Sequence, residues 1–222
     1  MRVAVLGTGM VGRAIAVRLD ELGHEVTVGT RDVERTMGRS DGEGSFGTWL
    51  SEHPKVRLAT FADAAANSEL AVNTTPGDVS LEALDAAGAA NLEGMVLIDI
   101  SNPLDFSQGF PPTLFVKDTD SLGERIQAAF PGVLVVKTLN TLTAALMVHP
   151  ETLADGDHTV FVSGDDAAAK ATATDLLRSL GHTDIIDLGD IRSSRGPEMF
   201  LPLWLRIMGA LGTGTFNIKV VR

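Results

Sequence analysis

A glycine pattern within the first twelve residues restricts the fold more than any other feature of this sequence. A short apolar run, Val3–Leu6, is followed at once by Gly7-Thr8-Gly9-Met10-Val11-Gly12, and apolar residues then recur at helical spacing. We therefore predict a strand, a tight turn and a helix. In such a unit Gly7 permits the turn, Gly9 lets the backbone approach a pyrophosphate, and Gly12 lets the helix pack closely on the strand.

The context of this pattern matters, because glycine-rich turns are common and a lone match carries little information. Here the pattern follows a strand and opens a helix, with Gly23 as a helix stop and Glu25–Gly29 as a second strand. The free N–H groups at the start of such a helix attract phosphates. The sequence therefore predicts a dinucleotide-binding unit.

The end of the second predicted strand indicates which dinucleotide is bound. Proteins that bind NAD carry an acid there, which accepts hydrogen bonds from the ribose 2′-hydroxyl and repels a 2′-phosphate. This chain has Thr30 and Arg31 instead, with Arg35 close behind, and these side chains can donate to a dianion. We therefore predict NADP(H). In the alternative, Arg31 and Arg35 are a solvated edge and Asp32 serves the ribose hydroxyl.

Composition and charge narrow the classes of function. With 222 residues, 44% of them hydrophobic, the chain can bury a sizeable core. The net charge of −11 argues against binding to nucleic acid or to an anionic membrane. The chain has no cysteine, which excludes disulfides, thiol nucleophiles and cysteine-based metal sites.

Targeting signals are not predicted. The glycine pattern begins a few residues after Met1, and the longest apolar run, Met199–Leu205, is broken by Arg206 and is too short to span a bilayer. We expect a cytoplasmic protein without a membrane segment. The apolar stretch 199–208 favours a core helix or the interface of a homodimer.

Strand and helix patterns alternate along the chain and predict an α/β fold with a doubly wound parallel sheet. We expect a Rossmann-type NADP-binding domain over residues 1–141. Residues 142–222 are expected to form a smaller C-terminal α/β extension that completes a second-cofactor pocket. Residues 35–48 are predicted to form a mobile loop beside the adenosine, and residues 79–90 one helix.

Three predicted strands end in polar residues, at the edge where open α/β sheets bind ligands. Thr75 follows one strand, Ser101 another, and Asn140 a third. Such side chains could line a crevice for the nicotinamide and its ribose, or cap turns and helices. Lys137 also lies at a strand end, and we interpret it as solvated rather than catalytic.

No catalytic acid, base or nucleophile is predicted. The sequence contains no G-x-S-x-G or HExxH motif, and Asp166 precedes an alanine-rich helix that it is expected to cap, so no metal site is predicted. Hydride exchange between two redox cofactors needs alignment of their rings more than proton transfer by the protein. The sequence therefore fits an enzyme that binds two cofactors.

Three segments, 3–12, 22–31 and 209–219, resemble the deazaflavin-dependent NADP reductases, which exchange a hydride directly between NADP(H) and coenzyme F420. The resemblance spans nearly the whole chain. It implies that residues 8–11 hold the pyrophosphate and that Thr30, Arg31 and Arg35 hold the 2′-phosphate. The resemblance also implies a set of residues around the nicotinamide, namely Thr75, Pro76, Val79, Ser101 and Asn140. A further set is implied to lie against the deazaflavin, namely Ser194, Arg195, Met208 and Leu211.

Residues 99–112 and 136–141 depart from the archaeal members of that family and look more like an actinobacterial branch. Two other functions stay open at this point. One is an NADPH-dependent ferric or flavin reductase, because the reductase domain of membrane ferric reductases shares this Rossmann pattern. The other is a non-enzymatic regulator that senses NADP and contacts a partner protein through its apolar C-terminal helix.

Overall fold

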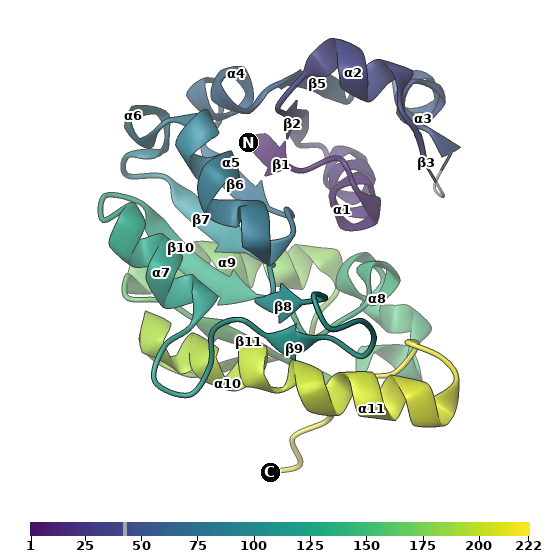
Figure 1. Ribbon diagram of the computed structural model, residues 1–222, viewed down its shortest axis with the longest axis vertical. Coiled ribbons are helices and arrows are strands. Elements are labelled where there is room, and N and C mark those ends of the chain that lie inside the picture. Colours follow the sequence, from purple (N-terminus) through teal and green to yellow (C-terminus); the bar gives the residue numbers. More distant parts are fainter. Residues whose placement is uncertain (42–43) are drawn as a thin grey trace.

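A computed structural model describes residues 1–41 and 44–222, and its central element is an eight-stranded sheet (Figure 1). The sheet strands are β1 (Arg2–Leu6), β2 (Glu25–Thr30), β5 (Arg57–Thr60), β6 (Leu70–Asn73), β7 (Val96–Asp99), β10 (Leu134–Thr138), β11 (Thr159–Ser163) and β12 (Asp184–Asp187). Two small hairpins lie outside it, β3 (Ser40–Asp41) with β4 (Gly44–Ser45), and β8 (Leu104–Asp105) with β9 (Thr113–Leu114).

The α-helices are α1 (Met10–Glu21), α2 (Val33–Gly38), α3 (Phe46–Glu52), α4 (Phe61–Ala66), α5 (Ser80–Ala87), α6 (Ala89–Leu92), α7 (Leu122–Ala129), α8 (Ala144–Val148), α9 (Ala167–Leu180), α10 (Arg195–Met199) and α11 (Leu201–Leu211). Short 3-10 helices are η1 (Gly77–Val79), η2 (Pro150–Thr152), η3 (Ala154–Gly156) and η4 (Ile191–Ser194). Asp166 caps α9 as predicted, because its Oδ1 accepts a hydrogen bond of 2.7 Å from Ala169 N.

The strand order is β12-β11-β10-β7-β6-β1-β2-β5, and every described pair is parallel except β10 with β11. The chain runs outward from β1 through β2 to β5, then returns to build β6, β7 and β10 on the other side. This reversal between β1 and β6 is the switch point at which doubly wound sheets bind ligands. The predicted α/β class and doubly wound parallel sheet are confirmed.

Alternation along β1 shows how the two faces of the sheet are covered. Val3 and Val5 belong to the apolar core that includes α1, α8 and α9, whereas Ala4 and Leu6 belong to the core with α4, α5 and α7. All four side chains are fully buried. Because successive strand residues point to opposite faces, an entirely apolar strand is expected only where helices cover both.

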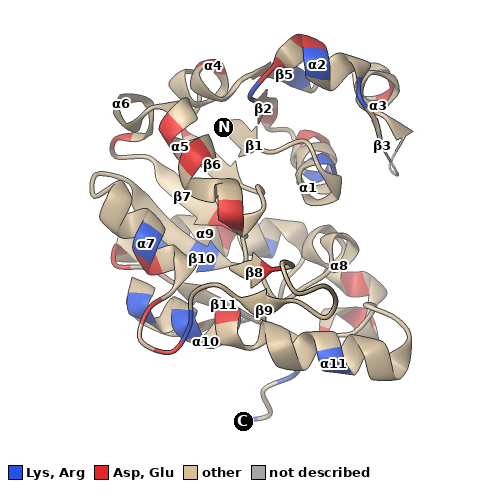
Figure 2. Cartoon of the chain, in the orientation of Figure 1, with Lys and Arg blue, Asp and Glu red and all other residues tan. Residues whose placement is uncertain are grey.

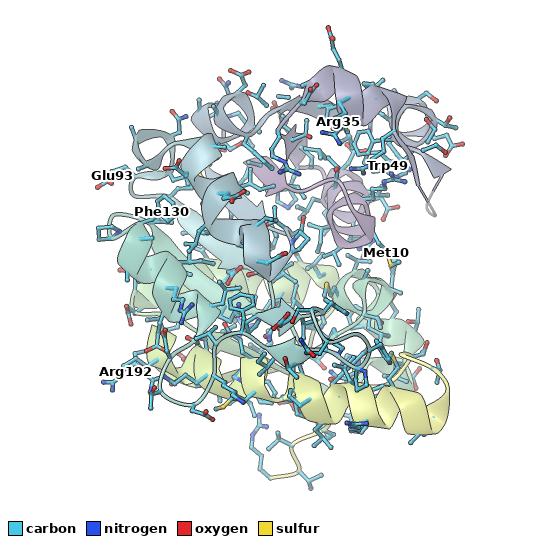
Figure 3. The ribbon with its side chains drawn as sticks, in the orientation of Figure 1. Met10, Arg35, Trp49, Glu93, Phe130 and Arg192 are labelled. Atoms are coloured by element: carbon cyan, nitrogen blue, oxygen red, sulfur yellow. The ribbon has the colours of Figure 1, made fainter. Side chains whose placement is uncertain are left out.

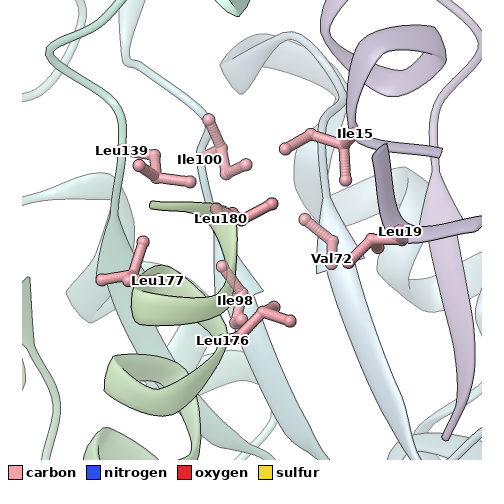
Figure 4. Close-up of a pocket in the computed structure, with 9 residues that line it drawn as sticks. All are labelled: Ile15, Leu19, Val72, Ile98, Ile100, Leu139, Leu176, Leu177 and Leu180. Atoms are coloured by element: carbon pink, nitrogen blue, oxygen red, sulfur yellow. The ribbon is translucent and has the colours of Figure 1, made fainter. Parts of the chain in front are cut away.

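The core between α1, α9 and the sheet is closely packed (Figure 4). Leu176, Leu177 and Leu180 of α9 meet Ile98 of β7 and Leu19 of α1 around a cavity of about 10 Å³. Its lining is wholly apolar. A space of this size without polar partners does not hold an ordered water, so we assign it to packing and not to a ligand.

Two local expectations were wrong. Within the predicted loop 35–48, the structure has the end of α2, both strands of the β3–β4 hairpin and the start of α3 at Phe46; residues 42–43 of that loop lie outside the described residues. The predicted helix 79–90 is divided into the end of η1, α5 and α6, and Gly88, with a φ of 90°, separates α5 from α6. Closure of residues 35–48 over a ligand stays a prediction.

The C-terminal part continues the same sheet through β11 and β12 and then forms α10 and α11, which lie along its outer side (Figure 1). The division at residue 141 stays a prediction. One face of α11 is core, since Leu201, Trp204 and Leu205 pack with Phe216. Leu203 and Leu211 are exposed, and a homodimer through them also stays a prediction. No helix in residues 1–41 or 44–222 has the length and apolar character to span a bilayer.

Protonation of one buried histidine is expected to make stability depend on pH. His182 Nε2 donates to Met147 O at 3.0 Å, and burial lowers the pKa of His182 below its usual value of 6.5. As pH falls below about 6.5, the unfolded chain binds a proton that the folded chain excludes, so the free energy of unfolding should fall by up to about 1.4 kcal/mol per pH unit. Urea titrations between pH 7 and 5 would measure this slope. The variant His182→Gln should have a shallower slope, and an unchanged slope would contradict the assignment.

Candidate functional site

A cleft of about 1640 Å³ opens at the carboxyl ends of β1, β2, β6 and β7. Its volume exceeds the roughly 300–1,000 Å³ of a typical pocket for one small ligand, so the cleft has room for a dinucleotide and for a second ring system beside it. Its lining includes most of the residues predicted for the NADP site, namely Gly7, Thr8, Gly9, Met10, Val11, Thr30, Arg31, Arg35, Thr75, Pro76, Val79 and Ser101.

The glycine turn is as tight as the pattern predicts. Gly7 has a φ of 126°, and a Cβ at this position would lie 2.6 Å from Thr74 Oγ1. A Cβ on Gly12 would lie 2.2 Å from Gly7 O, whereas a Cβ on Gly9 would meet no described heavy atom within 4 Å. Gly7 and Gly12 thus bring α1 onto β1. Gly9 faces open space at the first turn of α1, where N–H groups without a helical acceptor can bind an anion.

Two arginines that the sequence analysis missed brace this turn. Arg13 Nε donates to Thr8 O at 3.3 Å, and Arg39 Nη2 donates to the same oxygen at 3.1 Å. The guanidinium of Arg13 also lies 5.2 Å from the ring centre of Phe46 and 5.9 Å from that of Trp49. These contacts fasten α3 to the turn. Nothing in the sequence between residues 31 and 50 predicts that pairing.

The end of β2 forms the basic end of the cleft. Arg31 and Arg35 are exposed side chains that line it, and Figure 3 shows Arg35 on α2. Thr30 Oγ1 lies 2.7 Å from Thr36 Oγ1, and both hydroxyls are buried beside the arginines. Asp32 Oδ1 accepts from Arg35 N at 2.9 Å as the N-cap of α2. The carboxylate is therefore engaged at a helix start, which favours a phosphate over a ribose hydroxyl as the group bound here.

Charge reversal at Arg31 should weaken the binding of NADPH more than the binding of NADH. We expect Arg31→Asp to weaken NADPH binding about tenfold or more and to leave NADH binding nearly unchanged, because only NADPH carries the 2′-phosphate. Titration calorimetry with both dinucleotides would measure the difference. Arg57→Asp is the matched control, since Arg57 is also exposed and is not among the described residues of the cleft. Equal loss for NADPH and NADH would contradict the role of Arg31.

The predicted polar strand ends are joined beneath the cleft by buried hydrogen bonds. Thr75 Oγ1 donates to Asn73 Oδ1 at 2.6 Å, and Ser101 Oγ donates to Asp99 Oδ1 at 2.7 Å. Asn73 Nδ2 connects the two pairs by donating to Asp99 Oδ1 at 2.9 Å. The hydroxyls of Thr75 and Ser101 thus help to fix the loops that follow β6 and β7 while both residues line the cleft.

Lys137 is not solvated, and that interpretation was wrong. Its side chain is fully buried, and its Nζ lies 2.7 Å from Asp99 Oδ2, 2.9 Å from Glu198 Oε1 and 2.6 Å from Ser101 O. Burial disfavours the ammonium form, but the charges of Asp99 and Glu198 outweigh it and raise the pKa of Lys137. We call Asp99, Lys137 and Glu198 the buried triad. It lies directly under Ser101.

Glu198 extends the buried triad to the C-terminal helices. Its two carboxylate oxygens accept from Leu122 N at 2.8 Å and from Gly123 N at 3.0 Å, at the start of α7. Such N–H groups have no partner within their own helix, and a carboxylate there is stabilised. The triad therefore joins the ends of β7 and β10 to α7 and α10. The only sequence feature that pointed to the buried triad was a lysine at the end of an apolar strand.

Asn140 is placed behind the cleft wall and is not among the described residues that line it. Its side chain donates to Asn102 Oδ1 at 2.9 Å, and Asn102 Nδ2 donates back to Asn140 O at 2.8 Å. On the other side, a Cβ on Gly77 would lie 2.1 Å from Asn102 O. Asn140 thus orients Asn102, which does line the cleft.

The residues predicted to contact the deazaflavin also lie outside the described cleft lining. Ser194 Oγ is 2.7 Å from Ser121 Oγ, and Arg195 binds Glu124 through two bonds of 2.7 and 2.6 Å. Met208 packs on the core of α11, and Leu211 is exposed. Direct contact of these four residues with a cofactor stays a prediction. In the described structure Ser194 joins η4 to the start of α7, and Arg195 joins α10 to α7.

Comparison with known proteins agrees with this geometry. The sequence profile of the family "NADP oxidoreductase coenzyme F420-dependent" matches residues 2–103. A crystal structure of a candidate F420-dependent NADP-reductase from Arthrobacter sp. FB24 is 61% identical, covers 100% of both chains and superposes with a TM-score of 0.97. The chain belongs to the F420-dependent NADP oxidoreductase family. This membership confirms the resemblance inferred from residues 3–12, 22–31 and 209–219.

More distant relatives in the same comparisons differ in how much of their own length this chain matches. The F420-dependent NADP reductase of Methanothermobacter marburgensis is 28% identical over 93% of this chain and 92% of its own length. Rat metalloreductase STEAP3 is 29% identical over 97% of this chain, but the matched region is only 40% of that protein. Within the described residues, no group of three His, Asp or Glu side chains is arranged to hold a metal ion.

Proposed function

We propose that this family member transfers a hydride between NADP(H) and F420 by direct alignment of the two rings in the cleft. Family membership makes NADP(H) and F420 its cofactors and oxidoreduction its chemistry. In the NADPH-oxidising direction, a hydride leaves the nicotinamide ring and adds to the deazaflavin ring, and solvent supplies the proton that completes the reduced deazaflavin. The observation that carries the proposal is a large cleft that contains both a glycine turn and a basic end.

The residues of the chain act by binding and orientation. The first turn of α1 presents backbone N–H groups to the pyrophosphate, and Thr30, Arg31 and Arg35 hold the 2′-phosphate. Thr75, Pro76 and Val79 then face the nicotinamide half of the dinucleotide, together with Ser101. None of these groups is required to exchange a proton with a substrate, since alignment of donor and acceptor carbons is the main requirement of hydride transfer.

Charge along the cleft supports one orientation of the dinucleotide. Arg31, Arg35 and Arg39 line the cleft after β2, whereas the segments that follow β6 and β7 contribute Asp78, Glu82 and Asp105, and α7 contributes Arg125. In Figure 2, Lys or Arg residues are blue on α2, and Asp or Glu residues are red on α5 and beside β8. A 2′-phosphate is attracted to the first region and repelled by the three carboxylates of the second. The nicotinamide therefore lies toward Ser101, and the acceptor ring must approach it from the acidic half.

The direct test is to mix the purified protein with NADPH and oxidised F420 and to follow bleaching of the deazaflavin absorbance. NADH replaces NADPH in one control, and FMN, FAD or a ferric chelate replaces F420 in the others. Rapid bleaching that requires NADPH supports the proposal. Reduction of flavin or ferric iron without reduction of F420 would favour the alternative of a ferric or flavin reductase, and tight NADPH binding without any turnover would favour a sensor.

A further inference from the structure

The acceptor half of the cleft has a wall with two exposed aromatic side chains. Phe106 and Phe115 belong to the β8–β9 hairpin, line the cleft and are 58% and 37% exposed. Large aromatic groups usually bury most of their surface, and exposed ones inside a cleft mark a place where a ligand is bound. Neither phenylalanine is among the residues assigned to NADP(H).

Backbone hydrogen bonds fix the hairpin beside the nicotinamide end of the cleft. Leu104 N donates to Asn102 O at 2.9 Å, and Phe115 N donates to Pro103 O at 3.0 Å. Both acceptors follow directly after Ser101, at the end of β7. The backbone of the hairpin that carries the two rings is therefore hydrogen-bonded to the loop after β7. This loop also contains Ser101, which is assigned to the nicotinamide side of the cleft.

The hairpin also packs against α11. Leu104 and Leu114 pack against the core of Leu201, Trp204 and Leu205, in which the Trp204 ring is stacked on Phe216 with centroids 5.1 Å apart. Figure 1 shows β8 and β9 lying beside α11. Leu114 thus anchors the hairpin, while the next residue, Phe115, lines the cleft. The apolar C-terminal helix supports a wall of the site.

We propose that Phe106 and Phe115 form an aromatic platform on which the planar deazaflavin ring of F420 stacks beside the nicotinamide. This inference rests on the proposed function and names the residues that receive its second substrate. The neighbouring carboxylates Asp78, Glu82 and Asp105 disfavour a phosphate at this position, which leaves it to a flat ring. Stacking on an aromatic face recognises a flat heterocycle without any charged contact.

The platform is tested with the variants Phe106→Ala and Phe115→Ala. Phe110→Ala is the matched control, because Phe110 lies in the same hairpin, is 68% exposed and is not among the described residues of the cleft. We expect each platform variant to raise the KM and Kd for F420 about fivefold or more, and Phe110→Ala to change neither. The Kd for NADPH should stay within about twofold in all three. Fluorescence anisotropy of oxidised F420 gives its Kd without turnover.

Conservative variants keep the inference falsifiable if an alanine variant folds poorly. Phe115→Tyr retains a ring and should bind F420 as the wild type does, whereas Phe115→Leu keeps apolar bulk without a ring and should bind it weakly. Equal F420 binding by wild type, platform variants and Phe110→Ala would overturn the platform while leaving the proposed function intact. Parallel loss of NADPH and F420 binding would overturn it in favour of a structural role. A wild-type protein that binds NADPH but neither binds nor reduces F420 would refute both.

Discussion

The variant Gly12→Ala is expected to lose NADPH binding and to lower the free energy of unfolding by about 3 kcal/mol. Its Cβ would lie 2.2 Å from the oxygen and 2.9 Å from the carbon of the Gly7 carbonyl, and both atoms are backbone. Relief therefore requires α1 to move away from β1 and to open the glycine turn. Urea denaturation would measure the stability, and titration with NADPH would measure the affinity.

Gly9→Ala is the matched control for this prediction. Gly9 has an extended backbone with φ −80° and ψ −173°, and its Cβ would meet no described heavy atom within 4 Å. Its stability should therefore stay within about 0.5 kcal/mol of the wild type, while its affinity for NADPH should fall about tenfold, because the methyl group occupies the approach of the pyrophosphate. Wild-type stability in Gly12→Ala, or wild-type affinity in Gly9→Ala, would contradict the roles given to these glycines.

The fold could be predicted because its signals are local. The apolar strands, the turn at Gly7 and the helix after Gly9 are each specified by adjacent residues, and their alternation predicts a doubly wound sheet. The position of Thr30, Arg31 and Arg35 in the cleft could be predicted for the same reason, because they lie at or just after the end of β2. Their contact with a 2′-phosphate stays a prediction. Elements that were predicted wrongly depend on the backbone conformation of individual residues, such as the positive φ of Gly88 that divides a predicted helix.

The support of the site could not be predicted, because it depends on contacts between distant residues. Arg39 reaches the carbonyl of Thr8, and Glu198 reaches both Lys137 and the start of α7. Burial reverses the interpretation of such side chains, since a lysine at a strand end is solvated in most proteins. The hairpin that carries Phe106 and Phe115 was not predicted, because β8 and β9 are only two residues long and their packing on α11 joins residues that are distant in the sequence.

The variant Lys137→Met is expected to lower the free energy of unfolding by about 3–5 kcal/mol, more than Gly12→Ala. Methionine fills a similar volume but leaves the carboxylates of Asp99 and Glu198 buried without a cation. It also removes the donor to Ser101 O, so the loop that follows β7 loses a contact at the cleft floor. Urea denaturation of variant and wild type would measure the loss.

Two further variants test whether the stability lost in Lys137→Met comes from the unpaired buried carboxylates or simply from replacing a lysine. Lys170 pairs with Asp187, whose side chain is 53% exposed, so Lys170→Met should cost about 1 kcal/mol or less. The double variant Lys137→Met/Glu198→Gln removes one of the stranded charges and should recover part of the stability lost in Lys137→Met. If Lys137→Met is no less stable than Lys170→Met, the buried triad does not hold the strand ends to the C-terminal helices. A loss that the double variant leaves unchanged would instead assign the effect to packing around Lys137.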